Sequence, residues 1–129
     1  MTAETLRKDG FGVDKMFHCF VAEDTDLKKL VGYALFFYNY STWEGANVYL
    51  EDLYVTPEYR HGGLGTRMWR EVAKVAVERG CNRLDWVCLD WNKTSIDYYK
   101  SKGSTNLSET EGWNLFRLEG DKLKEFSKD

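Results

Sequence analysis

The chain has 129 residues, of which 43% are hydrophobic and 16% aromatic, and its formal net charge is −3. This length and composition favour one folded domain over residues 1–129, with a single core, and argue against a disordered chain. The slight negative charge, without a dominant cluster of lysine and arginine, argues against a nucleic-acid surface. No apolar run approaches the roughly 20 residues that a membrane-spanning helix needs.

The cysteines and histidines exclude two further classes of site. Cys19, Cys81 and Cys88 are odd in number and lack Cys-x-x-Cys spacing. We therefore expect reduced, mostly buried thiols in a cytoplasmic protein. His18 and His61 are the only histidines and lie far apart in the sequence, so we expect no metal. The first residues show no basic-then-apolar pattern of a signal peptide.

The predicted elements follow from hydrophobic periodicity and from the positions of glycine and proline. The strands come first as a meander and then alternate with helices, which predicts an α/β (mixed α+β) fold in which a mixed sheet has helices on both faces. The elements, in chain order, are the end of a helix before Asp9, strands near Phe17–Ala22, Val31–Tyr40 and Val48–Val55, a helix over Thr66–Arg79, a strand over Leu84–Asp90, a helix over Thr94–Lys102, a strand near Asn114–Leu118 and a short helix around Lys122–Phe126.

A glycine-rich turn, Arg60-His61-Gly62-Gly63-Leu64-Gly65-Thr66, lies between the third predicted strand and the helix that follows it. Backbone amides at such a turn, at the start of a helix, bind pyrophosphate. The spacing differs from a P-loop, which closes with Gly-Lys-Ser/Thr, and from the G-x-G-x-x-G turn of dinucleotide-binding folds. The turn is also compatible with a plain connection in which Gly62 and Gly63 only supply positive φ angles.

A second motif, Asn92-x-x-Ser95-x-x-x-Tyr99, follows the next predicted strand. Together with Arg60-x-x-Gly63-x-Gly65, it resembles the GNAT family of acetyl-CoA-dependent N-acetyltransferases. The resemblance runs from about Leu6 nearly to the C-terminus. It is most specific for the diamine acetyltransferase branch, which includes spermidine/spermine N1-acetyltransferases and thialysine N-epsilon-acetyltransferases, at Tyr49-Leu50-Glu51-Asp52, Asp90-Trp91-Asn92, Tyr99-Lys100 and Glu111-Gly112-Trp113.

The resemblance implies a GNAT fold, a homodimer, and acetyl transfer from acetyl-CoA to a small primary amine of the thialysine, diamine or polyamine class. It also implies that the chain lacks the first strand and first helix of the family, because Leu6–Gly12 looks like the end of the family's second helix. Two alternatives stay open. One is N-acetylation of a protein or peptide, and the other is a truncated domain that binds CoA or a partner without turnover.

The resemblance also assigns the acetyl-CoA contacts. Main-chain amides at the end of the third strand pair with the pantetheine arm and polarise the thioester. Arg60 either supports the phosphates or forms a structural salt bridge, and Asn92 and Ser95 either contact CoA or only cap a helix. The full expected set is Leu53, Tyr54, Val55, Arg60, His61, Gly62, Gly63, Leu64, Gly65, Thr66, Asn92, Lys93, Thr94 and Ser95.

Two side chains are candidates for the chemistry itself. Tyr99 is the candidate general acid, since a phenol with a pKa of about 10 can protonate the departing thiolate. It shares a helix face with Ser95, whereas Tyr98 is expected in the core. Glu51 is the candidate base, and strand alternation predicts that Asp52 points to the opposite face. The expected substrate contacts are Glu51, Asp52, Asp85, Trp86, Val87 and Glu111.

The distribution of charge along the chain supports separate binding regions for the phosphates of CoA and for the amine. Basic residues such as Lys100 gather around the two proposed CoA motifs, while acidic residues such as Glu109 lie elsewhere and could face a cationic substrate. An ordinary mixed surface is the alternative.

Overall fold

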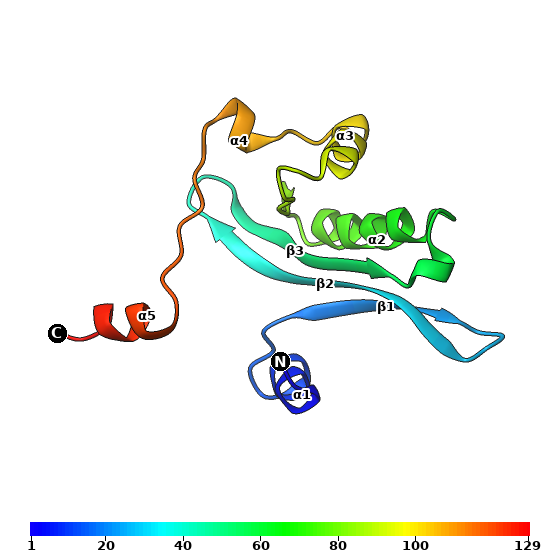
Figure 1. Ribbon diagram of the computed structural model, residues 1–129, viewed down its shortest axis with the longest axis horizontal. Helices are drawn as coiled ribbons and strands as arrows, with labels where there is room; N and C mark the ends of the chain where they lie inside the picture. The colour runs from blue at the N-terminus through cyan, green and yellow to red at the C-terminus, as the bar shows by residue number, and fades with distance from the viewer. The chain divides into compact units, whose positions relative to one another are not determined.

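A computed structural model describes all residues of the chain, 1–129, and divides it into two compact units, Met1–Val87 and Cys88–Asp129 (Figure 1). The first unit holds the sheet. Its elements are α1 (Ala3–Phe11), β1 (His18–Asp24), β2 (Lys29–Ser41), β3 (Gly45–Val55), the short 3₁₀ helix η1 (Pro57–Tyr59), α2 (Leu64–Glu78) and β4 (Leu84–Asp85).

The four strands lie in the order β1-β2-β3-β4. The first three form an antiparallel meander, and β4 runs parallel to β3 after the crossover through α2. The predicted mixed sheet flanked by helices is therefore confirmed. The last strand is shorter than the predicted Leu84–Asp90, and Val87 and Leu89, which lie beyond its end, are exposed.

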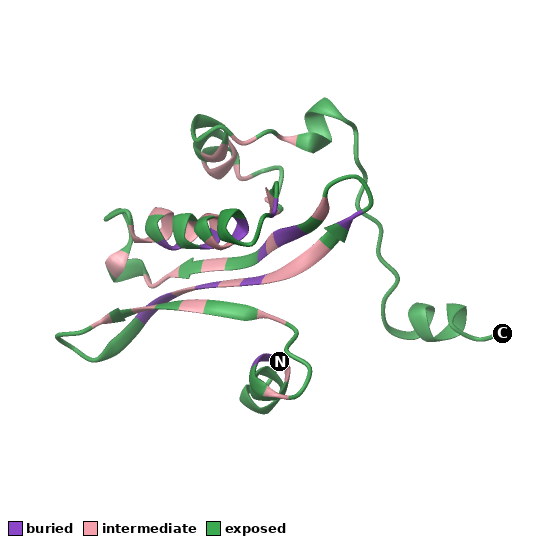
Figure 2. Cartoon of the chain, turned by 180° about the vertical axis from the view of Figure 1, so that it is seen from behind, coloured by how far each residue is buried: buried purple, intermediate pink, exposed green.

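The core of this unit lies between α2 and one face of the sheet (Figure 2). The helix buries Met68, Val72 and Ala76, four residues apart, because that spacing returns to the same side of a helix. The strands contribute alternate residues, as expected of a sheet with one covered face. The buried strand residues of this core are Ala34, Phe36, Val48 and Leu50.

The thiols differ from the prediction of mostly buried cysteines. Cys81, which follows α2, is buried in the core, while Cys88 is half-buried and Cys19 on β1 is exposed. Cys19 is exposed because side chains alternate along a strand. Its neighbours His18 and Phe20 pair with Phe36 and Ala34, whose side chains belong to the core, so Cys19 points to the other face.

The second unit contains only helices: α3 (Lys93–Ser101), α4 (Leu107–Thr110) and α5 (Gly120–Phe126). The predicted strand near Asn114–Leu118 is wrong. No other segment of this unit is a strand that could pair with it, and Leu115 and Phe116 are 83% and 88% exposed. The prediction that Tyr98 lies in the core is also wrong, since this side chain is 37% exposed.

Two absences bear on function. None of the helices combines the length and apolarity that crossing a bilayer would require. No group of three or more histidine, cysteine, aspartate or glutamate side chains is placed to hold a metal ion.

Candidate active site

The glycine turn leads directly into α2. Gly63 is the N-cap residue, in a left-handed conformation, and no side chain caps this end of the helix. The first main-chain hydrogen bond of the helix runs from the Arg67 amide to the Gly63 carbonyl, at 3.0 Å. The amino-terminal end of the helix is the positive end of its dipole.

The three glycines of the turn serve different needs. Gly63 has φ +83°, a conformation that favours glycine, so its presence has a backbone explanation. Gly62 has no positive φ, and a Cβ added there would meet nothing within 4 Å. At Gly65 an added Cβ would lie 3.7 Å from Cγ2 of Val55, an ordinary contact. The idea that Gly62 supplies a positive φ is therefore wrong, and the open space at both positions fits a pyrophosphate approaching the amides.

Arg60 is bound to the end of β3. Its Nε donates a hydrogen bond of 2.8 Å to the carbonyl of Val55, and its guanidinium lies 5.5 Å from the centre of the Tyr54 ring. No carboxylate forms a salt bridge with Arg60. The structural salt bridge considered for this residue is thus replaced by a main-chain bond, which fixes the first residue of the turn against the strand.

The carboxylates of β3 lie at a β-bulge. Asp52 pairs with Leu35, but the next residue of β2, Phe36, pairs with Leu50, so Glu51 is an extra residue in the ladder. As a result, Leu50 and Leu53 both pack in the core although two residues separate them. Glu51 and Asp52 are both exposed, and the prediction that they point to opposite faces is wrong.

Asp52 is bonded to a tyrosine that the sequence did not single out. The Tyr33 hydroxyl donates a hydrogen bond of 2.5 Å to Oδ2 of Asp52, across the β2–β3 pair. This bond, with burial and the nearby charge, raises the pKa of Tyr33 to about 12.

Asp85 adds a third carboxylate to this part of the sheet. It lies opposite Tyr49 in the β3–β4 register. Burial raises the pKa of the Tyr49 phenol, and the charges of Glu51 and Asp85 raise it further, which places both carboxylates near that ring. Arg83 partly compensates Asp85, with its Nε 3.4 Å from Oδ2.

The two residues after Asp85 lie in different surroundings. Trp86 packs edge-to-face on Trp69 of α2, with ring centres 5.1 Å apart, and so belongs to the side of the sheet that carries the core. Val87 is 69% exposed. The structure thus places Trp86 on the core side of the sheet.

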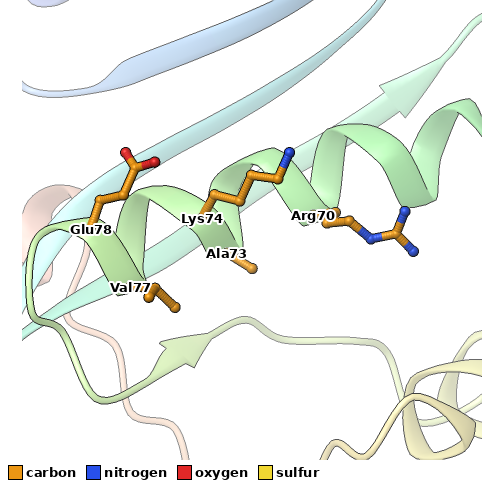
Figure 3. Close-up of a pocket in the computed structure, with 5 residues that line it drawn as sticks. All are labelled: Arg70, Ala73, Lys74, Val77 and Glu78. Atoms are coloured by element: carbon orange, nitrogen blue, oxygen red, sulfur yellow. The ribbon is translucent and has the colours of Figure 1, made fainter.

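A shallow hollow follows the outer side of α2 (Figure 3). The residues around it repeat at helical spacing and belong to one face of that helix. None of them is a predicted contact of acetyl-CoA or amine. They are Arg70, Ala73, Lys74, Val77 and Glu78.

In the second unit, Asn92 caps α3. Its Oδ1 accepts a hydrogen bond of 3.3 Å from the Ser95 amide, so the capping alternative holds for this side-chain oxygen. Lys93 and Thr94 form the start of the same helix. The side chain of Tyr99, one turn after Ser95, is half-buried.

Burial raises the pKa of the Tyr99 phenol, and the neighbouring Cys88 and Tyr98 raise it further. The rings of Tyr98 and Tyr99 lie 5.9 Å apart, and Nζ of Lys102 lies 5.6 Å from the centre of the Tyr98 ring. Tyr99 therefore keeps its proton at neutral pH, as a general acid must.

Two of the acidic residues expected to face a substrate have partners in this unit. Glu109 forms a salt bridge of 2.9 Å with Lys100, which pairs a residue expected near phosphate with one expected near amine. Glu111 follows α4 and accepts a hydrogen bond of 2.5 Å from Nε1 of Trp113. Glu109 and Glu111 thus have partners within their own unit, which lowers the negative charge that they could offer a cationic substrate.

The chain matches a known family over most of its length. The sequence model described as "Acetyltransferase (GNAT) family" matches residues 2–103. Thialysine N-epsilon-acetyltransferase of Bos taurus is 45% identical over 133 aligned residues, covering 98% of this chain and 78% of that protein. Spermidine/spermine N(1)-acetyltransferase-like protein 1 of Homo sapiens is 39% identical over 95% of this chain and 18% of that protein.

The fold has relatives among solved structures as well. An integron cassette protein from the mobile metagenome of V. cholerae aligns with a TM-score of 0.81 and 24% identity, over 100% of this chain and 80% of that one. That likeness concerns the fold. The family match, with the relative at 45% identity, shows that this chain belongs to the GNAT family and is an acetyl-CoA-dependent N-acetyltransferase.

Proposed function

We propose that this enzyme acetylates a small primary amine of the thialysine, diamine or polyamine class by direct transfer from acetyl-CoA. The observation that carries the proposal is the bulge in β3, which exposes Glu51 and Asp52 together within the strand that leads to the glycine turn. Such amines are cations at neutral pH, and paired carboxylates attract them. The relatives that carry thialysine and spermidine/spermine in their names support the same class.

In this proposal, main-chain groups bind the acetyl donor, acetyl-CoA. The amides of the glycine turn and the start of α2 hold the pyrophosphate, and Arg60 adds its charge. Main-chain groups of Leu53–Val55 bind the pantetheine arm. Acetyl-CoA supplies a thioester carbonyl that an amine can attack. The uncapped helix end and the open space at Gly62 and Gly65 fit this role.

The acceptor must lose a proton before it attacks. Glu51 binds the ammonium group and accepts that proton, directly or through a water, while Asp52 and Asp85 add attractive charge. As the new carbon–nitrogen bond forms and the carbon–sulfur bond breaks, the CoA thiolate leaves and takes a proton. We assign that proton to the hydroxyl of Tyr99, which burial keeps protonated. The second proton, which the nitrogen loses as the amide forms, restores the Tyr99 hydroxyl.

Release of CoA, followed with a thiol reagent, tests this function directly. The purified chain is mixed with acetyl-CoA and, separately, thialysine, ornithine, spermidine and peptides with free N-termini. We expect turnover with the small amines and little with the peptides. Turnover with the peptides alone would favour protein N-acetylation, while calorimetric binding of acetyl-CoA without turnover on any amine would favour a non-catalytic domain.

We also propose that the enzyme is a cytoplasmic homodimer. The outer edge of β1 pairs with no other strand, and unpaired edges favour association. The three cysteines are free thiols, which suits a reducing compartment. Sedimentation velocity at micromolar concentration tests the dimer, and a single species at 15.1 kDa would contradict it.

A further inference from the structure

Tyr33 occupies the face of the sheet that α2 does not cover. On β2 the neighbouring residues Gly32 and Ala34 face the helix: a Cβ at Gly32 would lie 2.9 Å from Cε of Met68, and Ala34 belongs to the core. Alternation therefore puts Tyr33 on the opposite face, where its hydroxyl reaches Oδ2 of Asp52 at 2.5 Å.

This bond restrains a carboxylate that would otherwise be mobile. Asp52 is exposed and follows the extra residue of a bulge, so packing does not fix its side chain. The phenol of Tyr33 engages Oδ2, which orients the carboxylate and leaves Oδ1 to meet a cationic amine. A hydrogen bond that ends on a charged group is shorter and stronger than one between neutral groups.

The ring of Tyr33 is in turn supported from the side of the glycine turn. Its centre lies 5.9 Å from that of Tyr54, the residue opposite it on β3. The other neighbour of the Tyr54 ring is the guanidinium of Arg60, the first residue of the turn. One tilted ring contact, one cation–π contact and one hydrogen bond thus connect the proposed acetyl-CoA-binding turn with the carboxylate of Asp52.

We propose that Tyr33 is a positioning residue for the amine substrate, acting through Asp52. It holds the carboxylate in the orientation that receives the ammonium group, and it does not touch the reacting atoms. The inference rests on the proposed function, because it assigns a role in binding the amine of that reaction. With a pKa of about 12, the phenol donates its hydrogen bond throughout the working pH range.

The first test is Tyr33→Phe, which removes the hydroxyl and keeps the ring against Tyr54. We expect the KM for the amine to rise about tenfold, as for loss of a hydrogen bond to a charged group, while kcat and the KM for acetyl-CoA stay close to the original values. The matched control is Tyr38→Phe, on the same strand but packed on the core side, which should leave both KM values unchanged.

A double-substitution cycle separates positioning from a general structural role. Asp52→Asn alone should raise the amine KM, and adding Tyr33→Phe to it should cause little further change, because the second residue acts through the first. Additive effects of the two substitutions would overturn the inference. So would an unchanged amine KM in Tyr33→Phe, or a parallel rise in the KM for acetyl-CoA.

A readout without turnover checks the pair itself. Titration of tyrosine absorbance should show phenol ionisation that is complete at lower pH in Asp52→Asn than in the unsubstituted protein, because the hydrogen bond to Asp52 is the main cause that raises the pKa of Tyr33. An identical titration in both proteins would overturn the pairing. Absence of turnover with every amine would overturn the proposed function and this inference together, whereas normal turnover with an unchanged amine KM in Tyr33→Phe would overturn this inference alone.

Discussion

The hydroxyl of Tyr59 donates a hydrogen bond of 2.5 Å to Oδ2 of Asp24. Asp24 is the last residue of β1, and its Oδ1 also accepts hydrogen bonds from the amides of Asp26 and Leu27 in the following turn. Tyr59 ends η1, directly before the glycine turn. One carboxylate therefore connects the β1–β2 turn to the segment directly before the proposed binding site for acetyl-CoA.

This bond predicts a pH dependence of stability. The bond from Tyr59, then the turn amides, hold the pKa of Asp24 below its ordinary value of 3.8. A depressed pKa in the folded state means that the charged carboxylate stabilises the fold above the unfolded pKa, and that this stabilisation is lost as pH falls through the lower, folded value. We expect the urea midpoint of Asp24→Asn to be lower than that of the original protein at pH 7, and the difference to vanish in stronger acid.

The measurement is a series of urea unfolding curves between pH 2 and 7, with Asp26→Asn as the control for loss of a nearby charge. Asp26 donates its main-chain amide to Asp24, so Asp26→Asn keeps that hydrogen bond and should not give the same profile. A constant difference between Asp24→Asn and the original protein across the whole range would show that the hydrogen bond does not depend on the charge of Asp24.

Gly65 offers the cleanest test of the proposal that the glycine turn binds the pyrophosphate of acetyl-CoA. Its φ is not positive and a Cβ would make only an ordinary contact with Val55, so Gly65→Ala should fold with nearly the original melting temperature. The added methyl group narrows the approach to the helix amides, and we expect weaker binding of acetyl-CoA by calorimetry. Gly63→Ala is the contrasting variant, because its left-handed backbone should cost about 1 kcal/mol or more of stability. Undiminished affinity in Gly65→Ala would remove the turn from the binding site.

The sheet and the long helix were predictable because their signals are local. Alternation in β2 and β3 and the helical spacing of Met68, Val72 and Ala76 are visible in the sequence, and Gly63 marks the start of α2. The bulge at Glu51 was also predictable from the sequence, although a regular strand was expected there. Leu50 and Leu53 cannot both lie on the core face of a regular strand, so one extra residue had to be accommodated.

Other features depend on pairs that are distant in the sequence. The bonds from Tyr33 to Asp52 and from Tyr59 to Asp24 join residues 19 and 35 positions apart, and nothing in the local sequence pattern marks them. The strand expected near Asn114–Leu118 has suitable apolar residues, but strand formation needs a neighbouring strand, which periodicity cannot supply.

In the proposed reaction, Glu51 is the residue whose charge binds the amine. We predict that Glu51→Gln lowers kcat/KM for the amine by at least about tenfold and leaves the affinity for acetyl-CoA unchanged, because the amide keeps the shape but neither attracts the cation nor accepts its proton. Steady-state kinetics and calorimetry measure the two quantities. Since Glu51 is exposed, the melting temperature should barely change. An unchanged kcat/KM for the amine would reject the role of base.

Tyr99 carries the prediction about the leaving group. Tyr99→Phe keeps the half-buried ring and removes only the hydroxyl, so the variant should fold and bind acetyl-CoA with nearly the original affinity. It should lose kcat by about 100-fold or more, because the thiolate then leaves without a positioned proton donor. Stopped-flow or steady-state release of CoA, at saturating amine and acetyl-CoA, gives kcat directly.

The control for Tyr99 is its neighbour Tyr98, whose ring contacts it but is more exposed to solvent and lies under Lys102. Tyr98→Phe should keep most of kcat, since removing a hydroxyl at the helix surface takes no proton from the thiolate. A second check varies the basicity of the leaving group. A more acidic thiol leaves more readily without being protonated, so the loss of kcat in Tyr99→Phe should be smaller with an acetyl donor of that kind. If Tyr99→Phe retains the original kcat with acetyl-CoA, the proton comes from water or another group, and Tyr99 serves only to pack α3.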